Sequence, residues 1–180
     1  LSLHDALPIC SMLLPEELQR FYIDKFDLTS QSGCEQKLSL FGLINMDEFD
    51  RYSIRSMATL KNLMQLKKLT FRKSHRSYYS QLPRIASFIG TSNQKELLTD
   101  TTGSRRFLCV EVNEKIDCTR PDYEQLYAQL KTELLTGERY WFTSEEEQAI
   151  QKNNRMFYRH SPEEDVFFQS GTEIISNIAI

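Results

Sequence analysis

The sequence predicts an α/β fold in which short, mostly parallel strands alternate with helices. Three apolar runs, over residues 40–46, 85–90 and 106–112, have the length of buried strands, and segments of helical periodicity separate them. The chain has 180 residues, of which 40% are hydrophobic and 26% charged, a composition typical of one globular domain. These three observations exclude a disordered, collagen-like or low-complexity chain.

The first part of the chain predicts two short helices and a strand. Pro15, followed by two glutamates, is typical of a first helical turn, because acidic side chains are favoured at the positive end of a helix. Phe21 then begins a candidate strand. Residues 30–40 predict a second helix, with Ser30 or Ser32 as its N-cap.

The central part predicts a strand over residues 40–46, which ends on Asp47 and Glu48. Residues 54–71 predict a helix, because their apolar side chains recur near helical spacing. Residues 85–90 predict the next strand, which Asn93 follows after two residues.

The last part predicts a turn over residues 100–104, a strand over 106–112 and two helices. The first helix covers residues 121–135 and stops at Gly137. The second begins at Ser144, with Glu147 completing a capping box. We expect Trp141 and its aromatic neighbours to pack against these helices.

Basic residues are concentrated in one segment. Eight basic and no acidic residues lie between Arg55 and Arg84, although the whole chain has a net charge of −3. A basic segment on an acidic body favours an anionic partner such as nucleic acid or phosphate, or is simply a solvated helix face.

The four cysteines are scattered and lack the spacing of a zinc site, which favours free thiols and a cytoplasmic location. No apolar run approaches the roughly 20 residues of a membrane helix, so no membrane partner is expected. Residues 1–9, LSLHDALPI, resemble a translated sequencing adapter and are expected to be a non-native scar. We expect a core over residues 10–120, a helical part over 121–168 and a tail of uncertain origin over 169–180.

Polar side chains follow the predicted strands at the ends where α/β folds place their sites. Asp47 and Glu48 have the arrangement that an ATPase uses to hold magnesium and to polarise the attacking water. Asn93 could orient that water or sense the γ-phosphate. Arg105 and Arg106 could neutralise charge on a transferring phosphoryl group, or simply form surface salt bridges. Each pattern alone is weak, but their order along the chain is that of helicase-type P-loop ATPases.

Three segments, INMDEFD, RKSHRSYYSQLPRIASFIGTSN and LLTDTTGSRRFLCVEV, resemble the virulence-associated protein E-like domain family. The resemblance covers roughly residues 10–168 and is most specific over residues 84–107. It implies a partial P-loop NTPase fold, similar to AAA+ proteins and superfamily 3 helicases, with a parallel sheet and flanking helices. It also implies a nucleic-acid-dependent ATPase or primase-helicase of phage or mobile-element type, assembled as a homo-oligomeric ring.

The resemblance assigns roles to particular residues. Asp47 would hold Mg²⁺ and Glu48 would act as general base. Asn93 would be a polar sensor, and Arg105 and Arg106 the arginine finger and phosphate sensor, without saying which is which. Contacts to DNA, single-stranded or duplex, or to the phosphates of ATP are expected from Lys61, Lys67, Lys68, Arg72 and Arg84.

One expected motif is missing from the sequence. A P-loop ATPase needs G-x-x-x-x-G-K-[ST], and no such run occurs in the 180 residues. The sequence therefore lacks the Walker A strand and loop, and we expect a fragment that is inactive alone and folds poorly. Two alternatives remain: a degenerate, non-catalytic nucleic-acid-binding or scaffold module, and a nuclease-like magnesium site built from Asp47, Glu48 and Asp50.

Overall fold

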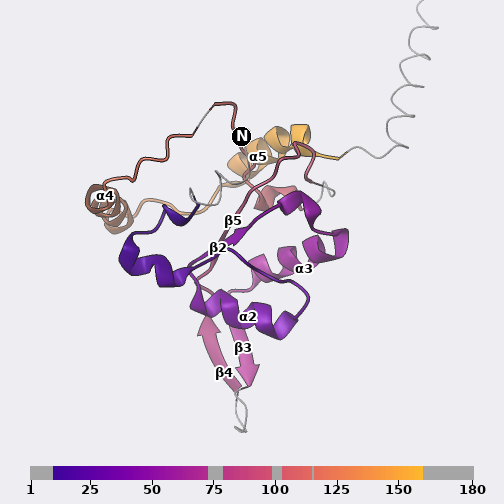
Figure 1. The fold of residues 1–180 in the computed structure, drawn as a ribbon, viewed down its shortest axis with the longest axis horizontal. Helices are drawn as coiled ribbons and strands as arrows, with labels where there is room; N and C mark the ends of the chain where they lie inside the picture. The colour runs from indigo at the N-terminus through magenta and orange to yellow at the C-terminus, as the bar shows by residue number, and fades with distance from the viewer. Residues whose placement is uncertain (1–9, 73–78, 99–102, 115, 160–180) are drawn as a thin grey trace, which may run out of the picture.

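Three parallel strands form the central sheet, in the spatial order β1–β2–β5 (Figure 1). They are β1 (Tyr22–Ile23), β2 (Leu43–Met46) and β5 (Ser87–Gly90). This computed structural model describes residues 10–72, 79–98, 103–114 and 116–159, so the expected scar and tail lie outside the described residues. The predicted α/β fold with a parallel sheet is confirmed, and its three strands lie where strands were expected, although a further strand predicted over residues 106–112 is not among them.

The elements before β2 follow their local sequence signals. Pro15 precedes the 3-10 helix η1 (Glu16–Phe21), which leads directly into β1. The helix α2 (Gln31–Leu40) begins after Ser30, whose hydroxyl accepts a hydrogen bond from the Gly33 amide at 3.4 Å. Ser30 is therefore the N-cap, as one of the two predicted alternatives had it.

The helix α3 (Ile54–Gln65) ends six residues earlier than predicted. Ser53 caps it, and Met57, Leu60 and Leu63 are its buried residues. The chain then enters an antiparallel hairpin of β3 (Lys68–Arg72) and β4 (Tyr79–Pro83). Leu69 is 1% exposed between the exposed Lys68 and Thr70, which is the alternation of a strand and not of a helix.

The pleat of the strands gives the sheet two different faces. Ile23, Ile44 and Phe88 are register partners on one face, and α2 and α3 cover this face to form the main core. Tyr22 and Asn45 belong to the opposite face. The Asn45 side chain is fully buried, and within the described residues neither its amide nor the Tyr22 hydroxyl makes a hydrogen bond of good geometry. A buried polar group without a partner costs stability, so the packing on this face stabilises the fold less than the packing on the first face.

The strand predicted over residues 106–112 does not form. Arg106 ends the 3-10 helix η3 (Ser104–Arg106), and the chain beyond it is extended but unpaired. Leu108 and Val110 are 67% and 74% exposed, whereas burial raises the pKa of the Cys109 thiol between them to about 11. The alternation of a strand is therefore present, but no described strand pairs with this segment, although β5 is at the edge of the sheet.

The two C-terminal helices are confirmed, but the packing expected of them is not. They are α4 (Tyr123–Leu135) and α5 (Ser144–Asn154), and η4 (Arg155–Phe157) follows. Gly137, at φ 82°, takes the left-handed conformation that ends α4. No residue of α4 is buried, and Tyr140, Trp141 and Phe142 are 84%, 60% and 54% exposed. The expectation that these aromatic residues pack against the helices is therefore wrong.

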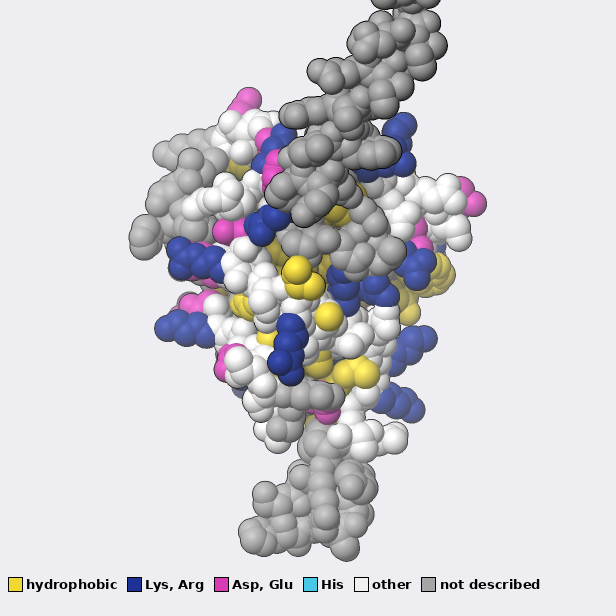
Figure 2. All heavy atoms as spheres, turned by 90° about the vertical axis from the view of Figure 1, so that its right-hand side faces the viewer, with side chains coloured by type: hydrophobic (Ala, Val, Ile, Leu, Met, Phe, Trp, Pro, Cys, Tyr) yellow, Lys and Arg dark blue, Asp and Glu magenta, His cyan; other side chains and the backbone are white. Residues whose placement is uncertain are grey.

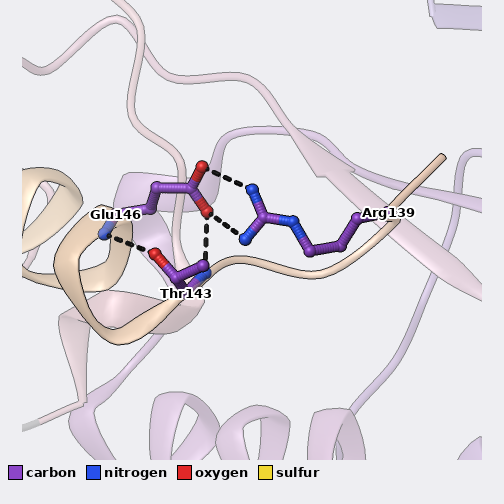
Figure 3. A network of polar contacts seen from close by, with 3 residues as sticks. All are labelled: Arg139, Thr143 and Glu146. Atoms are coloured by element: carbon purple, nitrogen blue, oxygen red, sulfur yellow. Dashed lines mark hydrogen bonds and ion pairs between the residues drawn. The ribbon is translucent and has the colours of Figure 1, made fainter.

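The capping box of α5 lies one residue earlier than predicted, at Thr143 and Glu146 (Figure 3). The Thr143 hydroxyl accepts from the Glu146 amide at 3.3 Å, and the Glu146 carboxylate accepts from the Thr143 amide at 2.7 Å. Arg139 donates two further hydrogen bonds to that carboxylate, at 2.7 and 2.9 Å. Hydrogen bonding by Arg139 and by the Thr143 amide lowers the pKa of Glu146.

Replacing Thr143 with alanine is expected to lower the free energy of unfolding by about 1 kcal/mol, because α5 loses its N-cap acceptor. Urea unfolding followed by circular dichroism measures this change. Thr143→Ser keeps the hydroxyl and serves as the matched control, with a loss of at most a few tenths of a kcal/mol expected. Equal losses in the two variants would show that the hydroxyl does not cap the helix.

Candidate functional site

The carboxyl ends of β2 and β5 lie side by side, because Met46 and Gly90 are register partners. The next residues, Asp47 and Thr91, are joined by a hydrogen bond from the Thr91 hydroxyl to Asp47 Oδ1 at 2.7 Å. One step further, the Ser92 hydroxyl donates to Asp50 Oδ1 at 2.8 Å. The structure therefore brings the predicted acidic residues to the predicted edge of the sheet and fastens them to the neighbouring strand.

Glu48 adopts a conformation that is unusual for a residue with a side chain. Its backbone is left-handed, at φ 50° and ψ 50°, and no other described non-glycine residue has a positive φ. Such a conformation costs about 1 to 3 kcal/mol, and residues that adopt it cluster at active sites and ligand-binding sites. The Glu48 carboxylate accepts from Arg51 Nη1 at 2.6 Å, and this pair lies at the surface.

Phe49 anchors this loop to the protein core. It is buried, its amide donates to the Thr91 carbonyl at 2.8 Å, and its ring packs against Phe107 with centroids 5.8 Å apart. Gly90 leaves room for the ring, since a Cβ at this position would lie 3.1 Å from Phe49 Cδ2. A side chain at the end of β5 would therefore press on the Phe49 ring, which would have to shift by a few tenths of an ångström.

Asn93 lies near this edge but does not take part in its contacts. The residue is exposed, in a bend after β5, and among the described residues its side chain has no hydrogen-bond partner. Thr91 and Ser92, which were not predicted as site residues, make the contacts instead. The signal for them was available: they are the first hydroxyl residues after the strand that pairs with β2.

A shallow hollow of about 420 Å³ opens beside Asp47. Tyr52, Asp27 and Lys37 also line it. Burial, followed by the negative charges of Asp27 and Asp47, raises the pKa of the Tyr52 hydroxyl. Hydrogen bonds from Thr29 lower the pKa of Asp27, so this carboxylate keeps its charge to lower pH than usual. The hollow thus presents mixed charges next to the acidic edge.

Arg105 and Arg106 lie in η3, apart from the acidic edge. Arg105 Nη1 contacts Glu147 Oε2 of α5 at 3.4 Å. With the Gln65 amide oxygen turned toward it, Arg106 donates to that oxygen from Nε at 3.1 Å and also from Nη2. Among the contacts of the described residues, none joins either arginine to Asp47. The ring contact of Phe107 with Phe49 nevertheless holds the two segments together.

Lys61 and Arg106 approach each other around Gly103. A Cβ at this buried glycine would lie 2.8 Å from Lys61 Nζ and 3.1 Å from Arg106 Nη1. Because Gly103 has no side chain, the positive charges of Lys61 in α3 and Arg106 in η3 can lie close together. Two neighbouring cations favour binding of an anion.

The other basic residues that were predicted to contact DNA or phosphate divide into two groups. Lys67 and Lys68 are exposed at the base of the hairpin, and Arg72 ends β3. Arg84 is half-buried and donates from Nε to the Leu66 carbonyl at 2.9 Å and from Nη1 to the Ala86 carbonyl at 2.6 Å. Burial lowers the pKa of Arg84. The structure thus gives Arg84 partners within the protein, while Lys67 and Lys68 face solvent.

The fold and this edge define a class: an α/β domain with two acidic residues at the carboxyl end of a central strand and a basic hairpin on the same chain. The chain belongs to the virulence-associated protein E-like domain family, whose model matches residues 11–159. This match confirms the family resemblance and favours a protein of phage or plasmid type. No curated protein matches the chain significantly. In the part of the chain that the structure describes, no helix is long and apolar enough to cross a membrane.

Proposed function

We propose that this chain is part of a nucleic-acid-dependent ATPase of the primase-helicase type, and that Asp47 and Glu48 carry its hydrolytic chemistry. One observation supports this most strongly. Asp47 ends the central strand β2 and is held by Thr91 from the neighbouring strand, while Glu48 follows in a strained left-handed turn. We also propose that the protein is cytoplasmic. It would assemble as a homo-oligomeric ring, because an arginine finger acts on a neighbouring subunit.

The donor set fits a magnesium ion. Thr91 donates to Asp47 Oδ1, which orients the carboxylate, and the Asp47 carboxylate would supply an oxygen ligand to the cation. Carboxylate oxygens are the ligands that Mg²⁺ prefers, and few protein ligands suffice when substrate phosphates supply the others. When bound, Mg²⁺ neutralises charge on the phosphates of ATP. Asp47 would hold the ion, and Glu48 would accept the proton of the attacking water.

The phosphates of ATP need a cradle that these 180 residues do not contain, because the sequence has no G-x-x-x-x-G-K-[ST] motif. We therefore propose that residues outside this sequence form the phosphate-binding cradle. Lys61 and Arg106, which approach each other at Gly103, would neutralise an anion, with Arg105 beside them in η3. Asn93 keeps its proposed role as sensor, which requires its side chain to turn toward bound nucleotide.

Nucleic acid is proposed to contact the β3–β4 hairpin. The hairpin projects from the body of the molecule (Figure 1), and Lys67, Lys68 and Arg72 lie along it. If each exposed lysine neutralises one phosphate, affinity falls with rising salt, with a slope of roughly 0.7 to 0.9 per contact on a log–log scale. Arg84, which holds the base of the hairpin, would act by positioning it.

One observation favours the alternative, a degenerate nucleic-acid-binding or scaffold module without turnover. The Glu48 carboxylate is paired with Arg51, which would compete with its work as a base. The nuclease-like reading has less support, since no group of three metal-ligating side chains forms among the described residues. The two leading proposals differ in whether Glu48 is needed for turnover.

Changing Glu48 to glutamine in the protein expressed with its upstream coding sequence is expected to lower kcat for ATP hydrolysis by about 100-fold or more. Nucleotide affinity should stay within a few-fold of that of the unchanged protein, because the amide keeps the shape of the side chain. Phosphate release and binding of a fluorescent ATP analogue measure the two quantities.

Glu96→Gln is the matched control, because Glu96 is an exposed carboxylate in the segment after β5, and it should leave both quantities unchanged. Full hydrolysis in the Glu48→Gln variant would remove Glu48 from the mechanism. No hydrolysis by the unchanged protein, with nucleic-acid binding intact, would favour the scaffold module.

A further inference from the structure

The C-terminal elements α5 and η4 hold the chain segment that leads to Arg105 and Arg106. At the start of this segment, the amides of Leu97 and Leu98 donate to the Phe157 carbonyl of η4, at 3.0 and 2.9 Å. Leu98 and Phe157 are both buried. The beginning of the segment is therefore fixed to η4 in the core.

Asn154, the last residue of α5, fixes the other end of the segment. Its side chain is 0% exposed, and its Nδ2 donates to the Ser104 carbonyl at 2.9 Å and to the Phe107 carbonyl at 2.8 Å. Ser104 begins η3 and Phe107 follows it, so the two hydrogen bonds span the turn that carries both arginines. An asparagine amide nitrogen has two hydrogens to donate, and both are used here.

The buried amide of Asn154 is not fully satisfied. Its Oδ1 is buried and makes no hydrogen bond within the described residues. A buried acceptor without a partner lowers the stability of the fold. Departures of this kind from a well-satisfied core are expected mainly at functional sites, which favours a role for Asn154 beyond stability.

The turn η3 depends on such outside contacts. It has three residues, and the hydrogen bonds of a 3-10 helix have poorer geometry than those of an α-helix. Two further contacts hold it: Arg105 Nη1 lies 3.4 Å from Glu147 Oε2 of α5, and the Phe107 ring packs on Phe49. The helix α5 thus holds both the backbone of η3 and the side chain of Arg105.

The placement of the two arginines matters more than their charge. Figure 2, which shows the molecule from the right-hand side of Figure 1, has Lys and Arg side chains spread over much of this face. Positive charge alone therefore does not distinguish η3. An arginine that stabilises a transferring phosphoryl group must be held in the right geometry, and a displacement of about 1 Å can lower the rate by about 100-fold.

We propose that Asn154 is a positioning residue for the arginine pair. It fixes the backbone of η3 so that Arg105 and Arg106 meet the phosphates of bound nucleotide, and it does not touch the nucleotide itself. The inference rests on the proposed function, because the arginines have a catalytic task only if ATP is hydrolysed. It adds to that function a dependence of the rate on α5, which acts through the arginines.

A double-mutant cycle tests this role in the protein expressed with its upstream coding sequence, by single-turnover phosphate release. Asn154→Ala should lower the rate about tenfold, because η3 is displaced. Affinity for a fluorescent ATP analogue should stay within a few-fold, since the arginines act on charge that develops in the transition state. In an Arg105→Ala/Arg106→Ala background, Asn154→Ala should lower the rate no further, because no arginine is left to position.

Asn153→Ala is the matched control. Asn153 is the exposed neighbour of Asn154, and its Nδ2 donates to the Cys109 carbonyl at 3.2 Å, outside η3. Its substitution should leave the rate unchanged. Asn154→Ser, which keeps one donor, is a milder second variant and should lower the rate by a smaller factor. Circular dichroism at the assay temperature establishes that each variant is folded.

Two results would overturn the role of Asn154. One is a full rate in the Asn154→Ala variant. The other is an equal loss of rate with and without the arginines, since a loss that does not depend on them is a general loss of structure. Failure of the proposed function gives a different result, in which the unchanged protein releases no phosphate or keeps its full rate after both arginines are replaced, and the inference then falls with it.

Discussion

Replacing Leu60 with alanine is expected to lower the free energy of unfolding by about 3 kcal/mol. Leu60 lies on the buried face of α3 and is 1% exposed, in the cluster that covers one face of the sheet. The substitution removes its side-chain contacts and leaves a cavity that a close-packed core fills only in part. Urea unfolding followed by circular dichroism gives the difference directly.

Ile54→Ala is the matched control, because Ile54 is in the same helix and is 73% exposed. Its effect should stay within about 0.5 kcal/mol, as for most surface substitutions. Equal effects at the two positions would mean that α3 does not pack its Leu60 face on the sheet. The core assigned to this side of the sheet would then be wrong.

Replacing Arg84 with alanine is expected to lower the free energy of unfolding by about 3 kcal/mol, since two hydrogen bonds from a charged group are lost. The guanidinium joins the end of α3 to the start of β5, through the carbonyls of Leu66 and Ala86. Without it, two partly buried carbonyls lose their donors at the base of the hairpin. The same unfolding experiment measures the loss.

Arg84→Lys keeps one charge but not the forked geometry, so an intermediate loss is expected. Lys67→Ala, at an exposed neighbour, should change stability little while weakening nucleic-acid binding. A different result at Arg84 would contradict the structural role. If Arg84→Ala keeps full stability but binds nucleic acid more weakly, the side chain serves as the phosphate contact that the sequence predicted.

Strands that are buried between helices, and helices with clear caps, were the parts of the fold that the sequence predicted well. The strand before Asp47 and the cap at Ser30 follow from local apolar runs and turn chemistry. The β3–β4 hairpin was missed, because the lysines of residues 67 and 68 continue the helical pattern of α3 and the pairing partner begins only at Tyr79. Local periodicity contains no information on a partner that distant.

The strand predicted over residues 106–112 does not form, because it has the pattern of a strand but no pairing partner among the described strands. Its alternation is that of a strand, and Cys109 is indeed less exposed than Leu108 and Val110. A strand also requires backbone hydrogen bonds to a neighbouring strand, and this segment makes none with β5, the strand at the edge of the described sheet. Sequence pattern predicts the faces of a strand but not whether another strand is available to it.

The acidic edge was predictable because parallel strands bring their carboxyl ends together. Asp47 and Glu48 lie where the sequence placed them. The hydroxyl of Thr91 was not predicted, because a threonine after a strand is common and only the register of β2 with β5 shows what it reaches. The roles of Asn93, Arg105 and Arg106 stay predictions, since each depends on bound nucleotide.

The most direct test of the proposed function is ATP hydrolysis by the protein expressed with the coding sequence upstream of Cys10 included. We expect phosphate release that requires Mg²⁺ and is stimulated by single-stranded DNA, together with a G-x-x-x-x-G-K-[ST] motif in the added sequence. A folded protein that binds DNA but releases no phosphate under these conditions would contradict the account and leave a non-catalytic binding module.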